Sequence, residues 1–165
     1  MTPDGRKFRA AAVKLGRMSD VQIRYAVRRA NTGLGLFATQ HIARGRRIIR
    51  YVGPILTSAE VEQRTGRYFF SIDEDYAIDG SARTNLARYI NHSCRPNAEA
   101  LVEGKRIWIW SKRAIEPGEQ ITIHYGKQYF DDYIKPVGCK CAPCATKAAK
   151  KSTKAKGKSK KSKAK

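Results

Sequence analysis

Apolar and polar residues alternate over several short segments of the chain. Residues 21–27 show this period, and further short runs rich in β-branched and aromatic residues span 48–52, 68–72, 76–78, 98–102, 105–111 and 120–124. A two-residue period sends successive side chains to opposite faces of a strand. Turn-forming pairs such as Gly53-Pro54, Glu103-Gly104 and Pro117-Gly118 separate the runs. The pattern therefore predicts a mainly β (α+β) fold of many short strands, with a hairpin through Glu103-Gly104.

Two segments favour helix. Thr57 and Glu60 have the spacing of a capping box, in which each side chain accepts a hydrogen bond from the other residue's backbone N–H. A short helix is therefore expected from Thr57 to about Thr65. Residues 83–90 are expected to form a short helix or a turn.

Residues 30–38 contain Gly33 and Gly35 and predict a glycine-hinged loop that leads into apolar residues. Their spacing matches the dinucleotide fingerprint G-x-G-x-x-A. That fingerprint requires a helix after the glycines and an acid about 20 residues further on. Residues 44–47 would break such a helix, and no acid occurs between Asp20 and Glu60. The sequence argues against a nicotinamide or flavin site, and leaves either close approach of the backbone to a ligand or an ordinary turn.

Positive charge is concentrated at the two ends of the chain. The formal net charge is +20, and the last twenty residues carry ten Lys and no acid. We expect a basic N-terminal arm over 1–18 and a disordered Lys-rich tail over 146–165, because such segments cannot bury enough apolar surface. The tail suits non-specific contact with nucleic acid or another polyanion. It would equally serve as a solubilising tail with no specific partner.

The sequence has neither the apolar run of a signal peptide nor a segment long enough to span a membrane. We therefore expect an intracellular protein without membrane contact. It would lie in the cytoplasm or nucleoid of a bacterium, or in the nucleus and on the chromosomes of a eukaryote. The host and the oligomeric state are left open.

The four cysteines fit a metal site. In a reducing compartment, cysteines are more often metal ligands or free thiols than disulfides. Cys139, Cys141 and Cys144 offer three thiolates, whereas structural zinc takes four ligands. Cys94 is the remaining cysteine, and it would complete the site if it met the other three in space. The alternative is four free thiols whose spacing is fortuitous.

A polar run, Asn91-His92-Ser93-Cys94, lies between apolar segments and belongs to a longer pattern. The pattern contains the glycine segment, Tyr51-x-Gly53, Asn85-x-x-Arg88-x-x-Asn91-His92-Ser93-Cys94-x-Pro96-Asn97, Glu116-Pro-Gly-Glu119, Tyr125-Gly126 and then Cys-x-Cys-x-x-Cys. This order resembles the SET domain family of protein-lysine methyltransferases with a post-SET zinc motif. The resemblance covers about residues 22–144.

The resemblance implies a SET fold of short β-sheets. It also implies a knot-like threading of the C-terminal segment that sets Asn91 and His92 beside Tyr125. The SET domain would span 19–126, and a small zinc-bound post-SET segment would span 127–145.

The resemblance also implies S-adenosylmethionine as cofactor, one structural zinc ion and a catalytic tyrosine at Tyr125. The residues implied to contact the cofactor are Thr32, Gly33, Leu34, Gly35, Tyr68, Arg88, Asn91, His92 and Tyr125. The implied zinc ligands are Cys94, Cys139, Cys141 and Cys144. Many family members have Phe or Tyr two residues before the catalytic tyrosine. Ile123 stands there, so mono-, di- and trimethylation all stay open.

The expected activity is transfer of methyl groups to lysines of basic proteins, histones or histone-like proteins. The Lys-rich tail is tethered to the same chain as the site, so its lysines are themselves candidate substrates for automethylation. The competing interpretation is a basic nucleoid- or chromatin-associated protein that binds nucleic acid and whose SET scaffold no longer catalyses. Retention of Asn91, His92 and Tyr125 argues against that interpretation.

Overall fold

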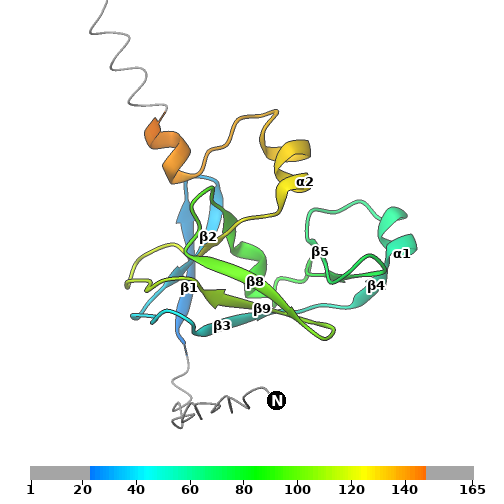
Figure 1. Ribbon diagram of the computed structural model, residues 1–165, viewed down its shortest axis with the longest axis horizontal. Helices are drawn as coiled ribbons and strands as arrows, with labels where there is room; N and C mark the ends of the chain where they lie inside the picture. The colour runs from blue at the N-terminus through cyan, green and yellow to red at the C-terminus, as the bar shows by residue number, and fades with distance from the viewer. Residues whose placement is uncertain (1–22, 148–165) are drawn as a thin grey trace, which may run out of the picture.

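Short strands build this fold, as the alternating pattern predicts. The computed structural model describes residues 23–147 (Figure 1). The predicted N-terminal arm and nearly all of the predicted Lys-rich tail lie outside the described residues. Within residues 23–147, no helix is long and apolar enough to cross a membrane.

The strands are β1 (Tyr25–Ala30), β2 (Gly33–Ala38), β3 (Arg47–Tyr51), β4 (Ile55–Thr57), β5 (Phe69–Ser71), β6 (Tyr76–Asp79), β7 (Asn91–His92), β8 (Ala98–Glu103), β9 (Arg106–Ser111) and β10 (Thr122–Ile123). The helical segments are α1 (Ser58–Glu62), the 3-10 turn η1 (Leu86–Tyr89), α2 (Lys127–Tyr129), the π-helical η2 (Phe130–Ile134) and residues 142–147. The described strands form four small sheets, ordered β1-β2, β3-β9-β8, β4-β6-β5 and β10-β7.

The predicted glycine loop is wrong for residues 33–38, which form strand β2. Antiparallel pairing with β1 runs from Ala30↔Gly33 to Tyr25↔Ala38. Gly35 serves close packing, because a Cβ there would lie 2.4 Å from Nε2 of Gln120. No helix follows the glycines, which agrees with the argument against a dinucleotide fingerprint. The loop prediction failed because glycine usually weakens a strand, and here tertiary packing overrides that preference.

The hairpin of β8 and β9 is confirmed, as are strands at 47–51, 69–71 and 76–79 and the short helix within 83–90. The capping box of Thr57 and Glu60 is also confirmed. Helix α1 ends at Glu62 and not near Thr65, because it buries no side chain that would stabilise a further turn. Strand β4 was missed, since three residues are too few to show a period.

The apolar core lies between the β1-β2 hairpin, the β3-β9-β8 sheet and η1. Its fully buried side chains are Leu36, Ile42, Ile107, Ile109, Ile115 and Ile121. Two buried asparagines of the polar pattern fix the loops around this core. Asn85 accepts from the Val52 N–H and donates to the Gly80 carbonyl. Asn97 accepts from the Thr122 N–H at 2.9 Å and donates to the Gln120 carbonyl at 2.8 Å.

Strands β7 and β10 lie side by side in parallel, with Thr122 opposite Asn91 and Ile123 opposite His92. The Ser93 N–H extends the pairing by donating to the Ile123 carbonyl at 2.9 Å. Parallel neighbours need a long connection between them, and the β8-β9 hairpin supplies it. The C-terminal segment is thereby brought against the polar run, as expected. The prediction of a strand over 120–124 was too long, because only Thr122 and Ile123 pair with β7.

Candidate active site and metal centre

Asn91 joins the polar run to the glycine strand. Its side-chain Nδ2 donates to the Leu34 carbonyl at 2.9 Å, although the two residues lie 57 positions apart. Leu34 is 49% exposed, and a Cβ added at Gly33 would meet nothing within 4 Å. The surface between β2 and β7 is therefore open beside exposed backbone. Thr32 lies in the exposed turn that precedes Gly33.

His92 links three other parts of the site. Its Nδ1 accepts from the Tyr125 N–H at 3.3 Å, and its Nε2 lies 3.5 Å from Sγ of Cys94. Its ring packs against His124 at 4.9 Å and Phe130 at 5.3 Å between centroids. Burial lowers the pKa of His92, and the neighbouring His124 lowers it further. The imidazole is therefore held neutral and accepts a backbone hydrogen bond.

Tyr125 lies two residues after the end of β10. Its hydroxyl donates to the Ile90 carbonyl at 2.7 Å. Burial raises the pKa of Tyr125 well above its ordinary value, and the phenols of Tyr129, Tyr51 and Tyr68 add to the rise. The hydroxyl therefore stays protonated near neutral pH. It is suited to orient another group by hydrogen bonding and is unsuited to act as a strong base.

Tyr68 and Arg88 form a second group of side chains, and the Tyr68 phenol is near enough to Tyr125 to raise its pKa. The guanidinium of Arg88 stacks 3.9 Å from the centre of the Tyr68 ring, and it also contacts the Ser81 carbonyl. The Tyr51 hydroxyl donates to the Tyr68 carbonyl at 2.7 Å. The buried Nε of Arg88 has no hydrogen-bond partner within the described residues.

A line of aromatic rings runs from Tyr125 to the surface, and the sequence did not reveal it. Tyr129 packs edge-on against Tyr125 at 5.3 Å, and Tyr133 packs against Tyr129 at 4.9 Å. Tyr133 is 65% exposed. The four-residue spacing of Tyr129 and Tyr133, shared by the ion pair Lys127–Asp131, was a usable signal. It is the spacing of neighbours on one helix face.

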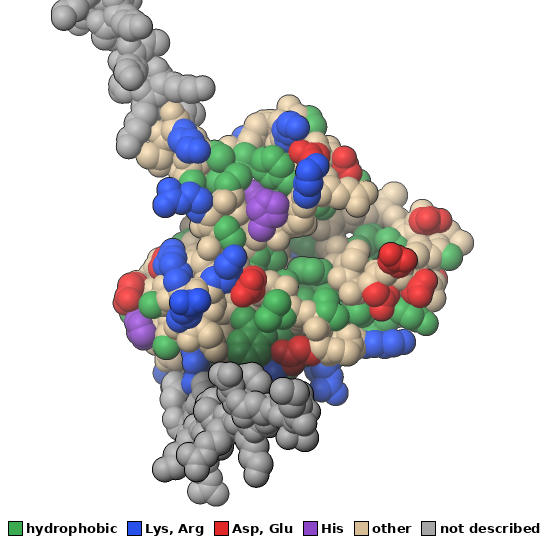
Figure 2. Space-filling view, in the orientation of Figure 1, with side chains coloured by type: hydrophobic (Ala, Val, Ile, Leu, Met, Phe, Trp, Pro, Cys, Tyr) green, Lys and Arg blue, Asp and Glu red, His purple; other side chains and the backbone are tan. Residues whose placement is uncertain are grey.

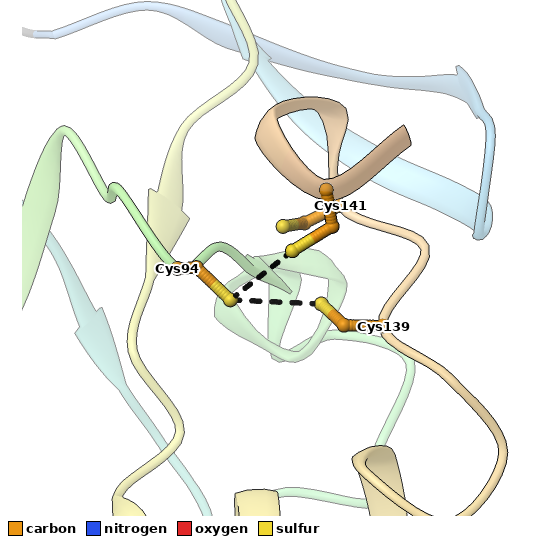
Figure 3. Close-up of side chains that lie close together, drawn as sticks. Cys94, Cys139 and Cys141 are labelled. Atoms are coloured by element: carbon orange, nitrogen blue, oxygen red, sulfur yellow. Dashed lines mark hydrogen bonds between the residues drawn. The ribbon is translucent and has the colours of Figure 1, made fainter. Parts of the chain in front are cut away.

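Cys94 meets the other three cysteines, as predicted. The four Sγ atoms all lie within 4.8 Å of one another. Figure 3 shows Cys94 and Cys139 directed at the same point from opposite sides. Cys94 lies 3.7 Å from Cys139 and 3.6 Å from Cys144 between sulfurs.

These distances fit one tetrahedral zinc ion. Zn–S bonds of about 2.3 Å place neighbouring sulfurs about 3.8 Å apart. Burial raises the pKa of the Cys94 thiol, and hydrogen bonds to the other three thiols raise it further. Burial also opposes ionisation of Cys141, but hydrogen bonds from the Cys94 and Cys144 backbones lower its pKa to about 7. Crowded thiols of this kind ionise together only when a cation balances their charge.

The comparison with protein families agrees with this geometry. The family model described as SET domain matches residues 33–126. The matched stretch includes both partners of the β7–β10 pairing and ends one residue after Tyr125.

Curated proteins of several eukaryotes are also similar to this chain. Histone-lysine N-methyltransferase set-2 of Caenorhabditis elegans is 41% identical over 115 residues, covering 62% of this chain and 8% of that protein. The Schizosaccharomyces pombe protein named histone-lysine N-methyltransferase, H3 lysine-4 specific, is 36% identical over 133 residues, or 73% of this chain and 14% of that protein. Histone-lysine N-methyltransferase set1 of Dictyostelium discoideum is 34% identical over 155 residues, or 86% of this chain and 10% of that protein.

The chain thus spans only a small part of the length of these relatives. The family match covers more than half of the chain, and the polar run, Tyr125 and the cysteine cluster meet where the resemblance requires. The chain therefore belongs to the SET domain family.

Proposed function

We propose that the chain is an S-adenosylmethionine-dependent protein-lysine N-methyltransferase that acts on basic proteins, histones or histone-like proteins, and that it holds one structural zinc ion. The observation that carries the proposal is the parallel pairing of β7 with β10. In a member of the SET domain family, this pairing sets Asn91 and His92 beside Tyr125. Action on such substrates would take the protein to the nucleus and chromosomes of a eukaryote, or to the nucleoid of a bacterium.

The open surface between β2 and β7 is the proposed cofactor site. The backbone of Thr32, Gly33 and Leu34 would line it and lead to the buried Gly35, and Asn91 and His92 would close its opposite side. The open space at Gly33 supports this assignment, because a ligand lying along the strand needs backbone without a side chain. The unpaired Nε of Arg88 beside Tyr68 would be the donor at the far end.

Tyr125 would orient the reacting amine. S-adenosylmethionine supplies a methyl group on a sulfonium centre, which an amine attacks in line. Keeping a lysine neutral at pH 7 costs roughly 4 to 5 kcal/mol, given a free pKa near 10.4. A channel walled by rings such as Tyr125 and Tyr129 would lower this cost by excluding water. The protonated Tyr125 hydroxyl would hold the amine in the attacking geometry.

Zinc would fix the segment that carries the aromatic rings. Cys94 follows His92 by two positions, and the other three cysteines follow η2. One ion on all four thiolates would close the loop over 127–138 against β7. Four thiolates leave no open coordination position, so the role of the metal would be structural.

A group of acidic residues on one lobe of the molecule favours the binding of basic substrates. Residues 55–81, which contain α1, β4, β5 and β6, carry six acids against two arginines. Figure 2 shows acidic side chains gathered over this lobe. Tyr68 of the same lobe is near enough to Tyr125 to raise its pKa. A lysine-rich segment would thus meet opposite charge on its way to Tyr125, although the chain as a whole is basic.

The alternative function, nucleic-acid binding on a non-catalytic scaffold, is favoured by the net charge of +20. The two functions differ in what they require of Tyr125. Binding of nucleic acid does not need its hydroxyl, whereas methyl transfer does.

The test is transfer of labelled methyl groups from S-adenosylmethionine to core histones and to bacterial histone-like proteins. The wild-type chain should label at least one of them, and Tyr125→Phe should not. Tyr76→Phe is the matched control, since the Tyr76 ring lies against Lys105 and its phenol is not among those that raise the pKa of Tyr125. Absence of transfer by a wild-type chain that binds the cofactor in calorimetry, together with binding of duplex DNA after removal of residues 148–165, would support the alternative.

A further inference from the structure

A hollow lies between the end of β3, strand β4 and the tip of the β8-β9 hairpin, outside the candidate active site. Its volume is about 620 Å³, which is within the range of ligand-binding pockets. In Figure 1 the hairpin tip points toward β4. None of the proposed cofactor, catalytic or zinc residues lines it. We propose that this hollow binds an acidic, apolar-centred peptide segment of a partner protein.

The charge in the hollow is unbalanced. Arg50, Lys105 and Arg106 line it, against the single acid Glu103. Glu103 is already engaged, because its carboxylate pairs with Arg47 at 2.8 Å. None of the ion pairs within residues 23–147 involves the three lining cations. Three cations without acidic partners around one concavity favour a ligand with several negative charges.

An edge strand supplies the exposed apolar surface of the hollow. Ile55 on β4 lines it and is 44% exposed, whereas Ile78, its neighbour on β6, is buried. Strand β4 pairs only with β6, so one side of it is free of strand partners among the described residues. Extended peptides bind to such edges and insert alternate side chains into neighbouring pockets. A peptide with an apolar residue between acids matches both the apolar surface and the cations.

A nucleic acid fits this hollow less well. Single-stranded nucleic acids bind proteins by stacking bases on exposed aromatic rings in a basic groove. Tyr51 is the aromatic residue that lines the hollow, and it is only 6% exposed. The nearby Tyr76 ring is covered by the ammonium of Lys105 at 3.9 Å. The aromatic surface that stacking requires is thus occupied.

Binding is tested with the full chain and a fluorescein-labelled eight-residue peptide that has a central Leu-Val pair flanked on both sides by Asp and Glu. Fluorescence anisotropy is measured in 0.15 M salt, which weakens non-specific attraction to distant lysines. The double variant Arg50→Glu, Arg106→Glu reverses two lining cations. The matched control Arg24→Glu, Arg44→Glu makes the same charge change at exposed positions outside the hollow.

We expect the lining variant to weaken peptide binding at least tenfold and the control variant less than threefold. Ile55→Ser, and Ser-Ser in place of Leu-Val in the peptide, should each weaken binding about fivefold. Unchanged thermal unfolding and zinc content check that each variant is folded. Equal loss in the lining and control variants would overturn the proposal. So would a twelve-residue oligothymidine that binds more tightly than the peptide and loses affinity only in the lining variant.

Discussion

The Tyr125 N–H donates a hydrogen bond to Nδ1 of His92 across 3.3 Å. This bond ties the residue that follows β10 to the polar run of β7, although the two residues lie 33 positions apart. The other ring nitrogen of His92 lies 3.5 Å from Sγ of Cys94. A single imidazole therefore stands between the proposed catalytic tyrosine and the proposed zinc site.

Replacing Tyr125 by Phe should abolish most methyl transfer while changing cofactor binding little, because the ring implied to contact the cofactor remains. The ring and its packing against Tyr129 remain, but the hydroxyl that would position the amine is lost. We expect the single-turnover rate to fall about 100-fold or more, in line with the loss of a positioned catalytic group. Calorimetry should give a cofactor Kd within about threefold of wild type. A rate near that of wild type would contradict the role given to Tyr125.

Replacing Cys94 by Ser should release zinc. Three thiolates and a serine hydroxyl are a weaker ligand set than four thiolates. Metal analysis of the purified chain should fall from about one zinc per chain toward zero. Limited proteolysis should then cut within residues 127–140 faster than in the wild type. If the variant keeps its full zinc content, the ion is held by another set of ligands.

The meeting of the four cysteines was predictable from their number and spacing, whereas the contact of Asn91 and His92 with Tyr125 followed only from the resemblance to the SET domain family. Four cysteines with none left over allow few arrangements, and the run Asn-His-Ser-Cys is unusual enough to carry that resemblance. The strand at Gly33–Ala38 was not predictable from local sequence. Glycine is needed at position 35 because the side chain of Gln120, from a distant segment, leaves no room for a Cβ. The aromatic line through Tyr129 was missed for a similar reason. Tyr129 and Tyr133 form a line with Tyr125 only in the folded structure, where β10 places Tyr125 against Tyr129.

Other acids show the same limit. In the sequence, Asp131 and Glu103 are as available to attract a basic substrate as any other carboxylate. In the structure Asp131 lies 2.7 Å from Lys127, and Glu103 lies 2.8 Å from Arg47. Local neutralisation of this kind depends on strand register and helix phase, which composition does not show. The acids of residues 55–81 emerge as a group only when α1, β5 and β6 are folded together.

Glu119→Gln should destabilise the fold near neutral pH and have little effect in acid. Hydrogen bonding from Arg113 lowers the pKa of Glu119 below its ordinary value of 4.5, burial opposes this, and Asn97 contributes a further lowering bond. A carboxyl whose pKa is depressed in the folded state adds stability above its unfolded pKa, and that stability is lost as the pH falls through the folded pKa.

Urea unfolding at pH 7 should show a loss of about 1.5 kcal/mol for Glu119→Gln, the lower end of the range for hydrogen bonds to charged groups, because Glu119 is partly exposed. The difference from wild type should shrink progressively below about pH 4.5. Glu116→Gln is the control, since Glu116 is exposed and donates its backbone N–H to Glu119, a bond that the substitution keeps. A loss that is equal at pH 7 and pH 3 would mean that packing of Glu119, not its charge, is what stabilises the fold.

Tyr133→Ala should raise KM for a lysine peptide while leaving kcat unchanged. Tyr133 is the outermost ring of the line that reaches Tyr125 through Tyr129. An exposed ring attracts a passing ammonium by about 0.5 to 1 kcal/mol, so KM should rise about two- to fivefold. Tyr129→Ala removes the ring that touches Tyr125 and should lower kcat as well. Tyr133→Phe keeps the ring and should match the wild type. A fall in kcat for Tyr133→Ala, or a Tyr133→Phe variant as impaired as Tyr133→Ala, would show that these rings do not guide the substrate to Tyr125.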